Sequence, residues 1–247
     1  MSQQSNSQQS NNSHWIIGAL LVATGIASSG YFISQTLYKS KVALNTAVVK
    51  GLAERRVESD KAYWTIEYSV TGNNKDDIPE LYGASEQDQA TIIELLKSSG
   101  FSDEEIKPGV LDYRKREYRD ENQKLVEEKH FLIGKIDVET HQVHLVAKVR
   151  AKLNKLIAQG LDLTNNAPSY HFTRLNDIKP AMLKEATTNA RLAANEFAQN
   201  AGVTVGGIRS ARQGGFIIRD VGSNYGDDKK IAKDVRVVTN VTFFLTD

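Results

Sequence analysis

The feature that most restricts the fold of this chain is an uncharged apolar run near its N-terminus. No Asp, Glu, Lys or Arg occurs from Trp15 to Tyr38, and the run opens with a strongly apolar stretch from Trp15 to Ala23. A helix needs about 20 residues to cross the hydrocarbon core of a bilayer. Trp15 at one end, with Tyr31 and Tyr38 towards the other, suits the two membrane interfaces. We therefore expect one transmembrane helix over residues 15–38.

The segments on either side of this run indicate how the chain is divided into domains. Residues 1–14 are almost entirely Ser, Gln and Asn, and such a polar tract cannot bury apolar area, so we expect it to be disordered. No basic region precedes Trp15, which favours a retained anchor over a cleaved secretory signal. We expect residues 45–247 to form the soluble domain.

Strand patterns alternate with helical patterns through the soluble part. Residues 178–201 have an apolar stripe at spacings of three and four, with Asp177 as the expected N-cap. A second helix is expected from a Ser85 cap, after a loop at 79–83, to Gly100. A third covers 146–157. The pattern predicts an α+β fold with a largely antiparallel sheet packed with helices. The expected strands are 47–56, 61–71, 110–118, 129–140, 169–175, 209–220 and 234–246.

Two segments carry a resemblance to a known family. The alanine-rich run Ala190–Ala198 and the following Gly206–Ser210 strand resemble the C-terminal signature of the SIMPL-domain family, and Val49–Glu54 resembles its opening strand. Members include bacterial periplasmic antigens and a mammalian binding protein of a pelle-like kinase. The resemblance spans roughly residues 48–245. It implies a periplasmic body that self-associates, and a link to oxidative or envelope stress tolerance.

Composition excludes several classes of function. The net charge is +1, so no overall field attracts nucleic acid. The chain has no cysteine, which excludes disulfides and thiolate metal sites.

Histidines are the first candidates for chemistry. His141 and His144 form an H-x-x-H pair near a helix start, but the carboxylate of a zincin motif is absent, so we expect two solvated side chains. His130 and His171 lie in expected strands, with no nucleophile beside them in sequence. The sequence predicts no metal site and no cofactor.

Serines and glycines also lack the motifs of catalysis. Ser210 and Ser223 fall in no nucleophile-elbow pattern. The pairs Gly206-Gly207 and Gly214-Gly215 lack the lysine of a phosphate loop, and we expect them to be bulges or close backbone approaches in a long bent strand. Carboxylates such as Glu127 occur in surface-like runs. We expect no catalytic residue.

The role of three arginines remains open. Arg209, Arg212 and Arg219 lie around the second glycine pair, where they either bind an anion, pair across a subunit boundary, or are ordinary solvated strand residues.

Orientation is the least constrained property. Lys39 and Lys41 follow the apolar run, and the positive-inside rule then puts the soluble domain in the cytoplasm. The resemblance puts it in the periplasm, and we adopt that reading. Our first hypothesis is a non-enzymatic, inner-membrane-anchored protein that self-associates and binds other macromolecules. The alternatives are a cytoplasm-facing signalling adaptor and an enzyme whose site is assembled from distant residues.

Overall fold

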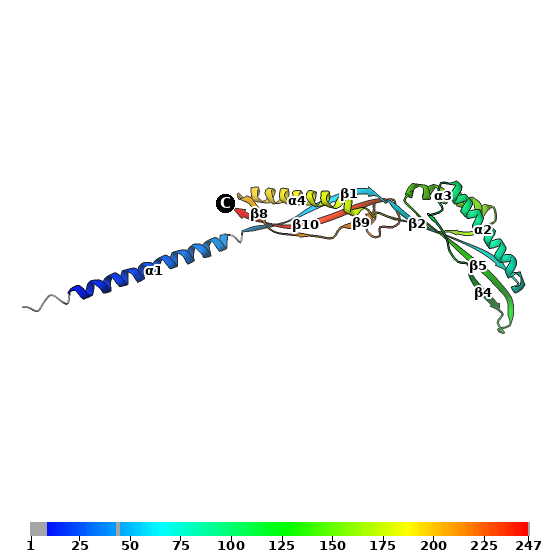
Figure 1. Ribbon diagram of the computed structural model, residues 1–247, viewed down its shortest axis with the longest axis horizontal. Coiled ribbons are helices and arrows are strands. Elements are labelled where there is room, and N and C mark those ends of the chain that lie inside the picture. Colours follow the sequence, from blue (N-terminus) through cyan, green and yellow to red (C-terminus); the bar gives the residue numbers. More distant parts are fainter. Residues whose placement is uncertain (1–8, 43–44, 247) are drawn as a thin grey trace, which may run out of the picture. The chain divides into compact units, whose positions relative to one another are not determined.

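The α+β fold predicted from the sequence is confirmed. The computed structural model describes residues 9–42 and 45–246 and contains helices, antiparallel strand pairs and an N-terminal apolar helix (Figure 1). The elements are α1 (Gln9–Val42), β1 (Thr46–Glu58), β2 (Lys61–Gly72), η1 (Lys75–Asp77), α2 (Ile78–Ser98), β3 (Ile106–Pro108), β4 (Asp112–Arg119), β5 (Leu125–Thr140), α3 (Val143–Ala158), β6 (Asp162–Asn165), β7 (Ser169–His171), α4 (Leu175–Asn200), β8 (Thr204–Gln213), β9 (Ile217–Asp220) and β10 (Ala232–Thr246).

Helix α1 contains the predicted apolar span. The 24 residues Trp15–Tyr38 are long and apolar enough to cross a membrane, although a signal sequence has the same character. Their side chains are all exposed. The hydroxyls of Thr24 and Thr36 donate to backbone oxygens one turn earlier, which satisfies them inside the helix. The predicted disordered tract falls partly on residues 1–8, which lie outside the described residues. The backbone from Gln9 onward belongs to α1.

The chain forms two compact units. Unit 1 comprises Met1–Leu52, Ala186–Gly214 and Val238–Asp247, and unit 2 comprises Ala53–Glu185 and Gly215–Val237. The region predicted as one soluble body therefore contributes to both units, and β1, α4 and β10 each supply residues to both.

In unit 1, α4 packs on the sheet through residues that are nearly all alanine. Ala190 and Ala194 form a buried cluster with Val241 and Phe243 of β10. At Gly51 of β1 the helix comes so close that an added Cβ would lie 1.8 Å from the backbone oxygen of Ala186. The glycine and the alanines of the family-like segments thus serve one purpose, which is close contact between helix and strand.

Unit 2 is built on a second, six-stranded sheet with the order β3-β5-β2-β6, in which β4 also pairs with β5 and β7 with β2. The predicted alternation holds along β5, where the residues from His130 to Val138 that point to one face are buried. Figure 1 shows α2 and α3 on one side of this sheet, where they bury Ile92 and Leu153 against Trp64 and Ile136. Residues that point to the opposite face, such as Thr65, Glu67 and Asp137, are partly or fully exposed.

Several predicted boundaries are wrong. Helix α2 begins at Ile78, so the expected loop at 79–83 is helical and Ser85 is a buried residue within the helix rather than its cap. Pro79 misled the prediction, because a proline in a first helical turn costs no hydrogen bond. Helix α4 begins at Leu175, which places Asp177 in its first turn rather than at the cap.

The expected strand over 209–220 is also wrong, because the structure divides it into β8 and β9. The amide of Gly214 donates to the backbone oxygen of Val238 at 2.9 Å, and an added Cβ would lie 2.7 Å from that oxygen. The close backbone approach expected at this glycine pair is confirmed. The bulge expected near Gly206 and Gly207 is confirmed too, since the β8–β10 register shifts there. Strands β3 and β6 were not predicted.

Candidate functional site

The hairpin of β4 and β5 is the most exposed part of unit 2. All eight residues of β4 are exposed, as are the first three of β5. The register runs from Asp112 opposite Ile133 to Tyr118 opposite Glu127. Among the described residues, β4 pairs with β5 alone, so its outer edge is free. Such an edge presents unpaired backbone donors and acceptors to another chain.

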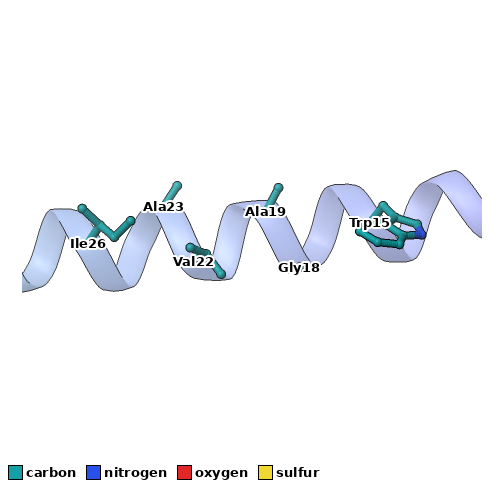
Figure 2. Close-up of a pocket in the computed structure, with 6 residues that line it drawn as sticks. All are labelled: Trp15, Gly18, Ala19, Val22, Ala23 and Ile26. Carbon is teal, nitrogen blue, oxygen red and sulfur yellow. The ribbon is translucent and has the colours of Figure 1, made fainter.

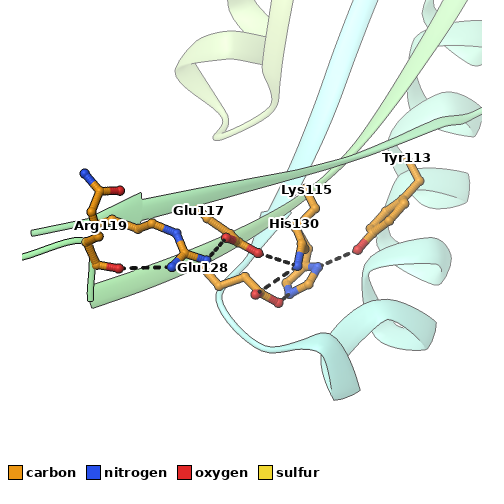
Figure 3. A network of polar contacts seen from close by, with 7 residues as sticks. Tyr113, Lys115, Glu117, Arg119, Glu128 and His130 are labelled. Carbon is orange, nitrogen blue, oxygen red and sulfur yellow. Dashed lines mark hydrogen bonds and ion pairs between the residues drawn. The ribbon is translucent and has the colours of Figure 1, made fainter. Parts of the chain in front are cut away.

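At the base of the hairpin, a polar network surrounds His130 (Figure 3). The imidazole is 1% exposed, and its Nδ1 lies 2.7 Å from the hydroxyl of Tyr113. Nε2 lies 3.0 Å from a carboxylate oxygen of Glu128, outside hydrogen-bonding geometry. Sequence analysis placed His130 in a strand but had no signal for these partners, because they are set by the cross-strand register.

Further along the same face, the charges alternate in a ladder. The ammonium of Lys115 lies 2.7 Å from Glu117 and 3.3 Å from Glu128, and the guanidinium of Arg119 lies 2.6 Å from Glu117. Lys115 and Arg119 together lower the pKa of Glu117 to about 2. The hydrogen bond to Glu117, and then that to Glu128, raise the pKa of Lys115. Only the contact between Lys115 and Glu128 crosses between the strands, so the ladder adds to a register that the backbone pairing sets.

The other face of the hairpin carries cations over aromatic rings. Arg116 lies 5.6 Å from the ring centre of Phe131, and Lys129 lies 5.9 Å from that of Tyr118. Arginine and tyrosine held at partly solvated positions are enriched at protein–protein interfaces. The hairpin is therefore an exposed surface on which charged and aromatic side chains contact one another.

The predicted histidine pair is divided between two partners. His141 Nδ1 lies 2.7 Å from the backbone oxygen of Asp60, while His144 Nε2 lies 3.2 Å from a carboxylate oxygen of Glu58. In the described part of the chain, no three His, Cys, Asp or Glu side chains are grouped to hold a metal ion. His171 stacks edge-on against Tyr63, with ring centres 5.5 Å apart.

Sequence reasoning missed a buried ion pair in unit 2. Lys233 is fully buried, and its ammonium lies 2.6 Å from Asp220, which is 4% exposed. Burial favours the neutral acid, but the hydrogen bonds from Lys233 and from the amides of Lys229 and Lys230 outweigh it and lower the pKa of Asp220. The pair fixes the loop between β9 and β10, which presents Tyr225 to solvent. The one sequence signal for this ion pair is that Lys233 occupies a position that is buried in the alternating pattern of β10.

The remaining candidates are scattered. Ser223 hydrogen-bonds within its own turn, and Ser210 is exposed on β8 opposite Thr242. Arg209 and Arg212 lie on β8 in unit 1, whereas Arg219 lies on β9 in unit 2.

Helix α1 has one hollowed face of small residues (Figure 2). Gly18, Ala19 and Ala23 leave a shallow groove bordered by Trp15, Val22 and Ile26. Small residues at this spacing let membrane helices approach closely.

These observations define a class: an α+β protein headed by a helix of membrane-spanning character, with an exposed, charged hairpin. The chain belongs to the SIMPL family, described as a protein of unknown function (DUF541), which matches residues 47–243. The predicted family is thereby confirmed. No curated protein matches the chain.

Proposed function

We propose that this protein is a non-enzymatic SIMPL-domain protein anchored in the inner membrane by α1. Its units face the periplasm, where it self-associates, binds other macromolecules and contributes to tolerance of oxidative or envelope stress. The observation that carries this proposal is the exposed β4–β5 hairpin, which has a free edge among the described residues and carries a charge ladder.

Anchoring is supported by the length and exposure of the apolar span. Membranes extracted with alkaline carbonate should retain the full-length chain in the pellet. A variant with Leu20→Arg and Ala23→Arg should be released, since each charge at a helix centre costs about 3 kcal/mol of insertion. Release of the unmodified chain would refute the anchor.

The periplasmic orientation rests on the resemblance to periplasmic family members, against the weak positive-inside bias of Lys39 and Lys41. Alkaline phosphatase fused after residue 247 should be active in this orientation. An inactive fusion, together with an active cytoplasmic reporter at the same junction, would favour the signalling adaptor instead.

Self-association is proposed to use the free edge of β4. Two antiparallel copies of one strand are related by an axis normal to the sheet, so residues facing each other share the same face. A register centred on Lys115 sets Arg114 against Arg116 and Lys115 against itself. A register centred on Arg116 instead sets Lys115 against Glu117 of the partner subunit, and Arg114 against Tyr118 of the partner subunit. Within residues 114–118, the second register has one like-charge contact, Arg116 against itself, and four favourable ones, so we propose it.

The absence of cysteine makes this register testable by cross-linking. Under mild oxidation in detergent, Arg116→Cys should form a disulfide-linked dimer. Leu192→Cys, which is also exposed and lies on α4, serves as the matched control and should remain monomeric on a denaturing gel. Light scattering of the unmodified chain should show a multimer. A strict monomer that also fails to cross-link at residue 116 would overturn the proposal.

Binding of other macromolecules and the stress role require cellular tests. Cross-linked membranes should yield foreign proteins with the unmodified chain, and fewer with a variant carrying Arg114→Glu and Arg116→Glu. Cells lacking the protein should be more sensitive to peroxide. Equal recovery with both chains, or unchanged sensitivity, would remove the corresponding part of the proposal.

A further inference from the structure

Charge is divided unequally between the two units. In sequence, unit 1 has six Lys or Arg residues and two Asp or Glu residues, although the whole chain is nearly neutral. The parts of β1, β8 and β10 that belong to unit 1 contain Lys50, Arg209 and Arg212 and not one acidic residue. A sheet with cations alone attracts an anionic partner.

One face of this sheet has no helix over it among the described residues of unit 1. Helix α4 runs along one face of the sheet (Figure 1), where it packs against Gly51, Val241 and Phe243. The alternate residues of each strand therefore point the other way. On β1 these include Val48, which is 72% exposed, and Leu52, which is 39% exposed. We call this surface the uncovered face. It consists of Val48, Lys50 and Leu52 of β1, Val238, Asn240, Thr242 and Phe244 of β10, and Ser210 and Arg212 of β8.

Apolar and basic side chains therefore alternate on the uncovered face. Val48 and Leu52 flank Lys50 on β1, and Arg212 lies opposite Asn240 across the sheet. Exposed aliphatic groups interspersed with lysine and arginine are typical of surfaces that rest in the headgroup layer of anionic membranes.

The chain also keeps the sheet of unit 1 near α1, which belongs to the same unit. Only residues 43–45 separate the end of α1 at Val42 from the start of β1 at Thr46, and three residues reach at most about 14 Å between those two ends. From Tyr38, the last residue of the apolar span, to Val42 the helix rises by about 6 Å, comparable to the thickness of a headgroup layer. Unit 1 is thus tethered within reach of the bilayer surface.

We propose that the uncovered face of unit 1 rests on a membrane surface of anionic phospholipids. This inference depends on the proposed anchoring by α1. The cations attract the lipid phosphates, and Val48 and Leu52 enter the boundary between headgroups and acyl chains. The bilayer would then restrict the orientation of unit 1 and not only its distance from the membrane.

The test uses the full-length, cysteine-free chain with single cysteines for an environment-sensitive fluorophore. Val48→Cys places the label on the uncovered face, and Leu192→Cys places it on the exposed side of α4 as the control. Each protein is reconstituted into vesicles of phosphatidylcholine, alone or mixed with phosphatidylglycerol, and flotation first verifies insertion. Quenching by lipids with a nitroxide near the headgroup then reports contact with the surface.

We expect strong quenching at residue 48 in phosphatidylglycerol vesicles, weak quenching at residue 192, and loss of the difference at high salt. In the Val48→Cys background, Lys50→Gln and Arg212→Gln should each lower the ratio of contacting to free label by about fivefold. Equal quenching at both positions, or at residue 48 in both lipids, would overturn the proposal. Self-quenching between labels at residue 48 regardless of lipid would assign the face to a second copy. A chain that does not float would refute the anchor itself, and this inference with it.

Discussion

Replacement of Gly51 by alanine tests the contact on which unit 1 depends. The new Cβ would lie 1.8 Å from the backbone oxygen of Ala186 and 2.6 Å from the backbone nitrogen of Ala190. A carbon–oxygen contact needs about 3.3 Å, so α4 must move away by about 1.5 Å. A gap of that size forfeits much of the dispersion energy between Ala190, Ala194 and Phe243.

We expect this substitution to destabilise the protein by about 3 kcal/mol, at the upper end of overpacking costs, because the clash is with backbone and no rotamer relieves it. Without the clash the sign would reverse, since alanine is favoured over glycine within a strand by about 0.5–1 kcal/mol. Gly207→Ala on β8 of the same unit is the control, since its Cβ would meet no atom within 4 Å.

The measurement is urea denaturation of both variants in detergent, followed by circular dichroism, with hydrogen exchange to locate the loss in β1 and α4. Destabilisation of Gly51→Ala and near-neutrality of Gly207→Ala would support the packing described above. If Gly51→Ala unfolded within about 0.5 kcal/mol of the control, the proximity of α4 to β1 would be wrong.

Three further predictions concern unit 2. Lys233→Met leaves the carboxylate of Asp220 buried without its cation and should lower the free energy of unfolding by about 3–5 kcal/mol. The loss should appear as a lower urea midpoint. An unchanged midpoint would show that the loop amides alone stabilise the buried carboxylate. In a carboxyl NMR titration, Glu117 should have a pKa of about 2 rather than its ordinary 4.5. Because the pKa in the folded state is the lower one, the ionised carboxylate stabilises the folded protein above pH 4.5. This stabilisation is lost as the pH falls towards 2. Lys115→Met should raise that pKa, and a value unmoved by this change would contradict the ladder. Gly134→Ala would place a Cβ 2.1 Å from a buried tyrosine ring and should cost about 1–3 kcal/mol, and an unaffected thermal midpoint would refute that contact.

The long strands and helices of this fold were predictable from the sequence, because burying one face places apolar residues at the repeat of the strand or helix. The alternation along β10 survives in the structure, since that strand buries one face. Helix α4 also buries one stripe, but at a spacing of four through Ala186, Ala190, Ala194 and Ala198. The spacing of three expected beyond Ala190 is wrong, and Phe197 is 56% exposed. Short strands such as β6 were not predictable, because four residues give too few alternations and β6 is fixed by pairing with β2. Ser85 shows the opposite error, in which a local capping pattern was overridden by tertiary burial.

The candidate site was predictable only in part. The charged character of the β4–β5 hairpin and the strand location of His130 follow from the sequence. The partners of His130 do not, because Tyr113 and Glu128 meet it only once the two strands adopt one register. The ion pair of Lys233 with Asp220 joins residues 13 positions apart through a folded loop, and no local pattern signals such a pair.

The β4–β5 hairpin carries exposed ion pairs beside its backbone pairing, and these link its stiffness to the surrounding electrolyte. Attraction between solvated charges is screened within a Debye length of about 8 Å at physiological ionic strength and about 3 Å at 1 M salt. The buried cores of both units are shielded from this influence, but the ladder from Lys115 to Arg119 is not. In a compartment whose ion content follows the outside medium, the β4–β5 hairpin would become more mobile at high ionic strength and less mobile at low ionic strength. The rest of the protein would stay folded.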